Sequence, residues 1–166
     1  MAMEIIFSSM VVIITFWFME FMAWFMHKFV MHGFLWNLHF DHHNTQPGFF
    51  QKNDTFFLIF AIPSWLFIMF GMIYQINYLT AVGLGILLYG IAYFLVHEVL
   101  IHNRFKKLRK LLFEKLNNDY LNTLIYAHKM HHKHIGKEYG ESFGMLIVDK
   151  KYYTEFETKK IKKSKL

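Results

Sequence analysis

The sequence predicts an all-α integral membrane protein, a helical bundle with about three to four transmembrane helices and a histidine-rich two-metal site at its cytoplasmic face. Hydrophobic residues make up 55% of the 166 residues and charged residues only 18%, a composition typical of membrane proteins. Three apolar runs are long enough to cross a hydrocarbon core of about 30 Å. Ten of the eleven histidines fall into two copies of one pattern.

The first apolar run covers residues 5–26 and predicts a transmembrane helix. Glu4 precedes the run, whereas a secretory signal peptide has a basic start, a shorter apolar run and a small-residue cleavage site. Glu20 lies seven residues before His27, two turns away on the same helix face. An ionisable group inside a membrane is a functional candidate. A protonated or hydrogen-bonded packing residue is the alternative.

Two further spans follow a polar and aromatic interval. The interval covers residues 27–54 and contains the breaker pair Pro47-Gly48. Residues 56–74 form the second predicted span, in which neighbouring helices can accommodate Pro63. After a short turn, residues 78–96 form the third span, and its glycines favour close helix packing.

The histidines repeat a two-part pattern, an HxxxxH pair followed by an HxxHH cluster. The pairs are His27/His32 and His97/His102, and the clusters are His39, His42, His43 and His128, His131, His132. Residues three and four apart share one face of an α-helix, so each cluster is expected to aim three imidazoles at one point. Residues five apart are about 140° out of register. We therefore predict an irregularity at both pairs, either a helix end or a π-type turn.

The predicted topology brings the two histidine sets to the same side of the membrane. Two crossings joined by a tight turn separate the sets, so both emerge at one face and can converge. Sixteen of the eighteen Lys and Arg residues lie at or beyond Arg104. By the positive-inside rule, the metal site and the C-terminus are cytoplasmic and the N-terminus is outside.

The C-terminal third predicts shorter elements. Apolar residues at helical spacing in 105–116, with lysines on the other faces, indicate an interfacial amphipathic helix. Asn117-Asn118-Asp119 ends it, and residues 120–130 should form the helix that delivers the last cluster. A fourth, shorter membrane helix here is an alternative. We expect residues 1–150 to form the membrane-embedded metal domain and residues 151–166 a basic, disordered tail.

The histidines indicate metal ligation. The chain has no cysteine, which excludes disulfides, iron–sulfur clusters and thiolate-ligated haem. Neutral imidazole suits Zn, Cu, Fe and Ni, and ten ligands suit two ions better than one. A ligating ring donates its other N–H to an acceptor, for which Asp41 and Glu98 are candidates, unless they are solvated surface charges. His134 falls outside the pattern and is expected not to be a ligand.

The motifs resemble those of one enzyme family. The segments that carry the resemblance are 27–33 (HKFVMHG), Trp36, 95–97 (LVH), 102–105 (HNRF), 127–132 (AHKMHH) and 142–144 (SFG). Their order resembles the bacterial β-carotene 3-hydroxylases, within the membrane fatty acid hydroxylase and sterol desaturase superfamily. The resemblance extends from Glu20 to Gly144.

This resemblance implies a non-haem di-iron centre and an O₂-dependent monooxygenase of the bacterial inner membrane. The implied ligands are His27, His32, His39, His42, His43, His97, His102, His128, His131 and His132, with no further catalytic residue. The implied reaction hydroxylates the β-ionone rings of β-carotene to give β-cryptoxanthin and then zeaxanthin, with the carotenoid entering from the bilayer. Electrons would come from an external donor such as reduced ferredoxin, which the basic tail could attract. The alternative role of that tail is topology setting and anionic-lipid contact.

Other functions stay open from the sequence. A fatty-acid or sterol hydroxylase or a carotenoid ketolase belongs to the same superfamily, although the box spacing favours carotene. A zinc-dependent membrane hydrolase also carries many histidines, and iron content with O₂ consumption would exclude it. A metal transporter would place its ligands in mid-span, whereas both HxxHH clusters lie outside the predicted spans. No RNA-binding or DNA-binding motif is present.

Overall fold

The protein is helical, and the residues that its structure describes form no strand. The computed structural model describes residues 1–44, 50–116 and 118–164. Three helical segments in these residues are long and apolar enough to cross a membrane. They are Ala2–Phe34, Lys52–Ile73 and Asn77–Ile101. The three predicted spans are confirmed, and the described residues add no fourth.

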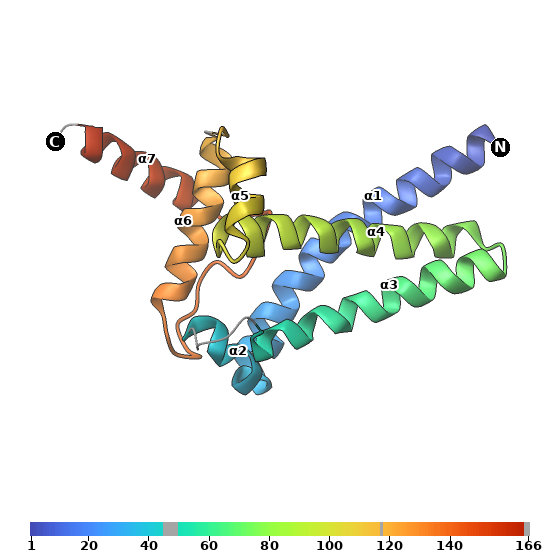
Figure 1. Ribbon diagram of the computed structural model, residues 1–166, viewed down its shortest axis with the longest axis horizontal. Coiled ribbons are helices and arrows are strands. Elements are labelled where there is room, and N and C mark those ends of the chain that lie inside the picture. The colour runs from blue at the N-terminus through green and yellow to red at the C-terminus, as the bar shows by residue number, and fades with distance from the viewer. Residues whose placement is uncertain (45–49, 117, 165–166) are drawn as a thin grey trace.

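The spans pack as a helical hairpin crossed by the first helix (Figure 1). Helices α3 (Thr55–Ile73) and α4 (Asn77–Tyr93) are joined by a short turn and lie side by side, and α1 (Ala2–Phe25) crosses α4 and packs against it. The buried core of this crossing contains Met19, Ile86 and Tyr89. Large apolar side chains cover the outer surface of all three helices, as lipid contact requires.

Two glycines allow the helices to approach closely. A Cβ atom at Gly83 would lie 2.8 Å from the carbonyl oxygen of Ser64, and one at Gly85 would lie 2.8 Å from that of Val12. The close contact at Gly83 also allows the Ser64 hydroxyl to donate a 2.8 Å hydrogen bond to the Gly83 carbonyl. The predicted close packing by glycine is confirmed at these positions, but it is wrong at Gly90, where an added Cβ atom would have no neighbour within 4 Å.

Both HxxxxH pairs are shaped by π-helical segments that continue the spans, and His102 is the C-cap residue of the second segment. Segment η1 (Met26–Phe34) extends α1, and η3 (Phe94–Ile101) extends α4. The His102 N–H donates to the His97 carbonyl over 2.9 Å, the five-residue step of a π-turn. This step turns the two rings to the same side, with centroids 4.5 Å apart, and the rings of the first pair are 5.3 Å apart. The predicted irregularities are confirmed.

Shorter helices complete the histidine end of the molecule. They are α2 (Trp36–His43), the 3₁₀ turn η2 (Lys52–Asp54), α5 (Lys106–Phe113), α6 (Asp119–Lys133) and α7 (Lys150–Ser164). Helix α5 is the predicted amphipathic helix, and α6 is the predicted carrier of the last cluster. The Asn118 side chain caps α6 by accepting hydrogen bonds from the N–H groups of Tyr120 and Leu121. Pro47-Gly48 and Asn117 lie outside the described residues.

Helix α7 occupies most of the tail for which the sequence predicts disorder. Aromatic residues interrupt its basic stretch, and Tyr152 is buried. The Tyr126 hydroxyl on α6 donates to Glu155 over 2.9 Å, and Lys160 pairs with Asp119 over 2.9 Å. These contacts hold one side of α7 against α6. The aromatic and acidic residues among the lysines therefore allow the segment to pack as a helix.

Candidate metal centre

The patterned histidines meet at one end of the bundle, carried there by η1, α2, η3 and α6. Nine of the ten form two groups in which the ligand atoms lie within 4.8 Å of one another. The first group is His27, His32, His39, His43 and His131, and the second is His42, His97, His102 and His128. The tenth, His132, places its Nε2 2.8 Å from Nε2 of His128. Both halves of the sequence contribute to each group, so the expected convergence is confirmed.

The side chain of His134 lies outside both groups and is 37% exposed. Its Nε2 is 3.9 Å from a Glu141 carboxylate oxygen. Only the backbone carbonyl of His134 reaches the first group, where it accepts from His43 Nδ1 over 3.1 Å.

Each HxxHH cluster is divided between the groups, so the expectation that its three imidazoles aim at one point is wrong. His39 and His43 face the first group, whereas His42 faces the second. On α6, His128 belongs to the second group and His131 to the first. Consecutive residues differ by about 100° around a helix axis, so neighbouring histidines diverge to either side. Two facing helices can therefore supply two adjacent sites.

The Nδ1 atoms of the first group are held by oxygen acceptors. Four acceptors are backbone carbonyls of residues 134–147, called the strap below. The four pairs are His27 with Phe143 (3.1 Å), His32 with Lys137 (3.2 Å), His43 with His134 (3.1 Å) and His131 with Glu141 (2.9 Å). The fifth ring, His39, donates to the Asn53 side-chain oxygen over 2.6 Å. Because these oxygens only accept, each Nδ1 carries the proton and each Nε2 of a neutral ring is a lone pair.

This arrangement fits a bound cation. The Nε2 atoms of His27 and His39 are 3.2 Å apart, and those of His32 and His131 are 3.3 Å apart. Two lone pairs at such distances repel unless a positive charge lies between them. The Nε2 atoms of His42 and His43 are buried without any hydrogen-bond partner, although buried nitrogen atoms normally have one. One metal ion in each group satisfies these atoms, with His42 facing the second group and the other rings the first.

Burial favours the neutral form of imidazoles in both groups. It lowers the pKa of His39 to about 3, against the opposing hydrogen bond to Asn53. Burial and neighbouring rings lower the pKa of His43 to about 3 and that of His102 to about 2. The pKa of His131 is lowered for the same reasons. Neutral rings at pH 7 are the form that binds a metal.

In the second group, His97 is held by a network of charged side chains. Glu98, one of the two predicted acceptors, accepts from His97 Nδ1 over 2.7 Å. Arg104 donates to Glu98 over 2.6 Å and makes two bonds to Asp54, of 2.8 and 2.9 Å. Both carboxylates are largely shielded from solvent. This network ties the end of the third span to the start of the second.

Asp41, the other predicted acceptor, supports the histidines only indirectly. Its carboxylate accepts from the backbone N–H groups of Lys52 and Asn53 rather than from a histidine. It thereby orders the turn that carries Asn53, the partner of His39. The sequence reasoning missed Asn53 and Gln51, whose side-chain oxygen is 3.3 Å from His42 Nδ1. The only sequence feature that could have indicated them is that two amide side chains stand immediately before an apolar span.

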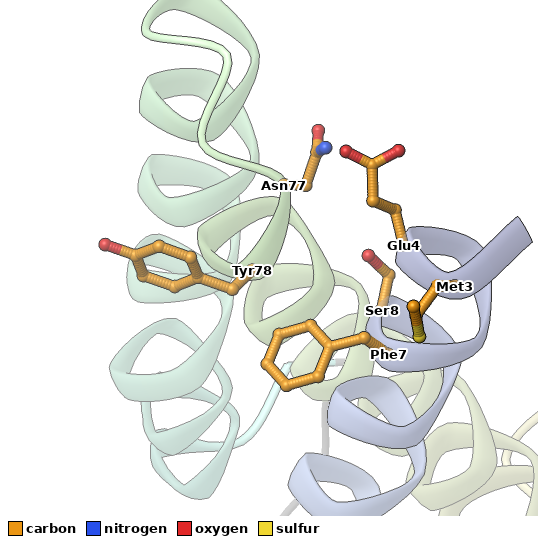
Figure 2. A pocket seen from close by; sticks show the side chains of 6 residues that line it. All are labelled: Met3, Glu4, Phe7, Ser8, Asn77 and Tyr78. Carbon is orange, nitrogen blue, oxygen red and sulfur yellow. The ribbon is translucent and has the colours of Figure 1, made fainter. Parts of the chain in front are cut away.

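Two hollows of similar size lie at opposite ends of the spans. One of about 280 Å³ adjoins the histidines and is lined by His42, His43, Ile101, His102, His128, Lys129 and His132. The other, of about 290 Å³, lies between the starts of α1 and α4. Figure 2 shows Glu4, Ser8 and Asn77 turned toward one another there, with Phe7 below them. Only the first hollow offers imidazole ligands, so we place the site there.

Comparison with known proteins identifies the wider group. A model of the fatty acid hydroxylase family matches residues 12–154. The chain belongs to the fatty acid hydroxylase family. The expected superfamily resemblance is confirmed, and so is the predicted enzyme class, a hydroxylating oxidoreductase.

Curated relatives of this fatty acid hydroxylase family member include proteins from bacteria and plants. A beta-carotene hydroxylase from Pantoea ananas is 37% identical over 145 residues, 86% of this chain and 78% of the relative. One from Pseudescherichia vulneris is 35% identical over 144 residues, again 86% and 78%. The chloroplastic beta-carotene 3-hydroxylase 2 of Arabidopsis thaliana is 34% identical over 136 residues, 79% of this chain and 43% of the relative. No solved structure matches the chain.

The chemistry open to this fatty acid hydroxylase family member follows from the donor set. Only nitrogen ligands converge in the two groups, and neutral imidazole suits iron as well as zinc or copper. The histidine groups can bind metal, and their adjacency lets two ions act on one small molecule. The hollow beside the second group gives such a molecule access.

Proposed function

We propose that this chain is a β-carotene 3-hydroxylase, which inserts oxygen from O₂ at ring carbon 3 of β-carotene to give β-cryptoxanthin and then zeaxanthin. The observation that carries the proposal is the pair of adjacent histidine groups, of which the first has all five of its Nδ1 atoms hydrogen-bonded to oxygen acceptors. The similarity to bacterial beta-carotene hydroxylases over 86% of the chain supports the substrate.

The proposed metal centre is a non-haem di-iron site held by the ten patterned histidines, which would supply O₂ activation when loaded. The first group would hold one ion and the second group the other. His132 lies between them, stacked on His43 with centroids 4.5 Å apart and 2.8 Å from His128. The strap carbonyls keep the protons on Nδ1, and burial of the rings excludes water from Nε2.

The proposed membrane arrangement delivers an apolar substrate to this site. A carotenoid is a rigid rod about as long as the hydrocarbon core is thick, roughly 30 Å, so its end ring reaches the membrane face. Entry would be lateral from lipid, past Ile101 at the end of the third span. The positive-inside rule supports a cytoplasmic site, because Lys106, Lys107 and Lys110 on α5 are exposed beside it.

Electrons would come from a separate acidic donor protein, of which reduced ferredoxin is the proposed example. Hydroxylation of one C–H bond by O₂ yields one alcohol and one water, and it consumes two electrons and two protons. The exposed lysines of α5 support docking of an acidic partner. Anionic lipid headgroups are the competing ligand for these lysines.

Expression in a bacterium engineered to accumulate β-carotene tests the proposal. Pigment separation should reveal mono- and dihydroxylated products. Unchanged β-carotene, with the protein folded and iron-loaded, would remove the carotene assignment and leave fatty acids or sterols to be tested. Zinc in place of iron, without O₂ consumption, would indicate a hydrolase instead.

A paired substitution tests the ligand set. His131→Ala should abolish the products, because His131 belongs to the first group. His134→Ala should retain them, because its backbone carbonyl still accepts from His43 after the side chain is removed. Equal loss of product in both variants would contradict the proposed ligands.

A further inference from the structure

Glu20 is a buried carboxylate in the first membrane span, and it faces the strap. Its side chain is 4% exposed. One carboxylate oxygen accepts from three consecutive backbone N–H groups, those of Met145 (2.9 Å), Leu146 (2.8 Å) and Ile147 (2.9 Å). The other oxygen accepts from the Tyr89 hydroxyl of α4 over 2.7 Å. Four donors therefore bond to one carboxylate, three of them at the same oxygen.

The strap, whose last three residues bond to Glu20, is also the segment that orients the imidazole rings of the first group. Four of its carbonyls accept from Nδ1 of His27, His32, His43 and His131, over 2.9–3.2 Å. Phe143, one of these acceptors, lies only two residues before Met145. A loss of the strap's anchor would therefore move the oxygen that orients the His27 ring.

The backbone of the strap is held in an unfavourable shape. Tyr139 and Ser142 adopt positive φ values of 63° and 59°, a left-handed conformation that is unfavourable for residues with a Cβ atom. Such conformations persist only where the surroundings impose them. At Gly144 a Cβ atom would collide with the Ile147 carbonyl oxygen, so the turn that presents the three N–H groups to Glu20 needs glycine. The strap thus depends on an external anchor to keep its shape.

We propose that Glu20 is a positioning residue for the first metal ion: by anchoring the strap, it fixes the carbonyls that orient four of the five imidazoles of that group. The inference rests on the proposed two-metal site and not on the carotenoid assignment. Glu20 touches neither metal nor substrate, and it acts from within the membrane span on rings at the membrane face.

The effect is confined to one of the two ions. Nδ1 of His97 and of His42 bonds to the side chains of Glu98 and Gln51, and within the described residues the histidine rings that donate to strap carbonyls all belong to the first group. Loss of a partner that orients a metal-bound histidine weakens metal affinity by about 10–100-fold. Removal of the Glu20 carboxylate should therefore weaken Fe²⁺ binding at the first site and leave the affinity of the second site unchanged.

The test combines two measurements on the full-length protein in detergent. Hydrogen exchange of the Met145–Ile147 amides in metal-free protein reports whether the strap is anchored. Anaerobic titration with Fe²⁺, followed by metal analysis, reports the ions bound per chain. The variants are Glu20→Leu, Glu20→Gln and Tyr89→Phe. Ser64→Ala is the matched control, because it removes a buried hydrogen bond of the same helical bundle away from the strap.

Glu20→Leu should accelerate exchange at the three amides and leave one Fe²⁺ site of wild-type affinity and one weakened by about 10–100-fold. Glu20→Gln keeps an acceptor oxygen but loses the charge, so its weakening should be smaller, and Tyr89→Phe should be smaller still. Ser64→Ala should match wild type in both measurements. If Glu20→Leu does not fold, the graded effect of Glu20→Gln and Tyr89→Phe decides the question.

Three results would overturn the inference. One is wild-type protection of the three amides in the Glu20 variants. Another is fast exchange with both Fe²⁺ sites unchanged, and the third is equal weakening of both sites. Failure of the wild-type protein to hydroxylate β-carotene while it binds two Fe²⁺ ions would instead contradict the proposed substrate and leave this inference intact.

Discussion

The two histidine groups lie side by side but are supported by different means. In the first group, backbone carbonyls of the strap hold four of the five Nδ1 atoms. In the second, the Glu98 carboxylate holds His97 and is itself held by Arg104. A backbone acceptor survives any side-chain substitution at its own position, whereas a carboxylate does not. The first group should therefore be sensitive to the path of the chain, and the second to individual charged residues.

Acidification should have the largest effect, because it acts on both groups alike. Burial lowers the pKa of His39 and His43 to about 3 and that of His102 to about 2, whereas the unfolded-state value is about 6.5. The unfolded state thus binds more protons at pH values between these limits, so stability is fully present above pH of about 6.5 and falls as the pH drops toward 3. Thermal unfolding of metal-free protein from pH 8 to 4 measures this, and a flat profile would contradict neutral buried rings. Fe²⁺ should be released from both sites over the same range.

Arg104→Leu should act on the second group alone. The substitution leaves Glu98 and Asp54 without their shared cation, and removal of one partner from a shielded ion pair lowers the free energy of unfolding by about 3 kcal/mol. Displacement of Glu98 should also weaken the second Fe²⁺ site by about 10-fold or more. Thermal unfolding and Fe²⁺ titration measure both effects. Equal weakening of the two sites would show that they are coupled.

Asn53→Ala should act on the first group alone and by less. It removes the one side-chain acceptor of that group, the oxygen 2.6 Å from His39 Nδ1, while the four strap carbonyls stay in place. We expect about 10-fold weaker binding at the first Fe²⁺ site and no change at the second. Asn53→Asp keeps an acceptor oxygen and serves as the control. A second site weakened by Asn53→Ala would contradict the separation of the groups.

Asp41→Asn should have the smallest effect. Asp41 supports the first group only through the backbone of Lys52 and Asn53, and asparagine keeps an oxygen that can accept there. Fe²⁺ affinity should change by less than about 3-fold, which corresponds to roughly 0.6 kcal/mol. A loss as large as that of Asn53→Ala would place Asp41 in direct contact with the site.

Much of this architecture could be predicted from residue spacing. The five-residue step from His97 to His102 forced a π-turn or a helix end, since no regular helix brings such rings together. The assignment of ligands to ions could not be predicted, because the 100° between His42 and His43 places them in different groups only once the facing helix is known. The strap carbonyls have no sequence signature at all, since every residue carries the same carbonyl. Glu20 could be singled out as a charged residue within an apolar span, but three of its four partners lie more than 120 positions away in the sequence.

The π-helical segments continue the first and third spans without a break. Helix tilt adjusts to the thickness of the surrounding bilayer, so a change of tilt would carry His27 and His97 with it. Catalytic rate should consequently respond to acyl-chain length in reconstituted vesicles, and the lipid itself would tune the spacing of the two histidine groups.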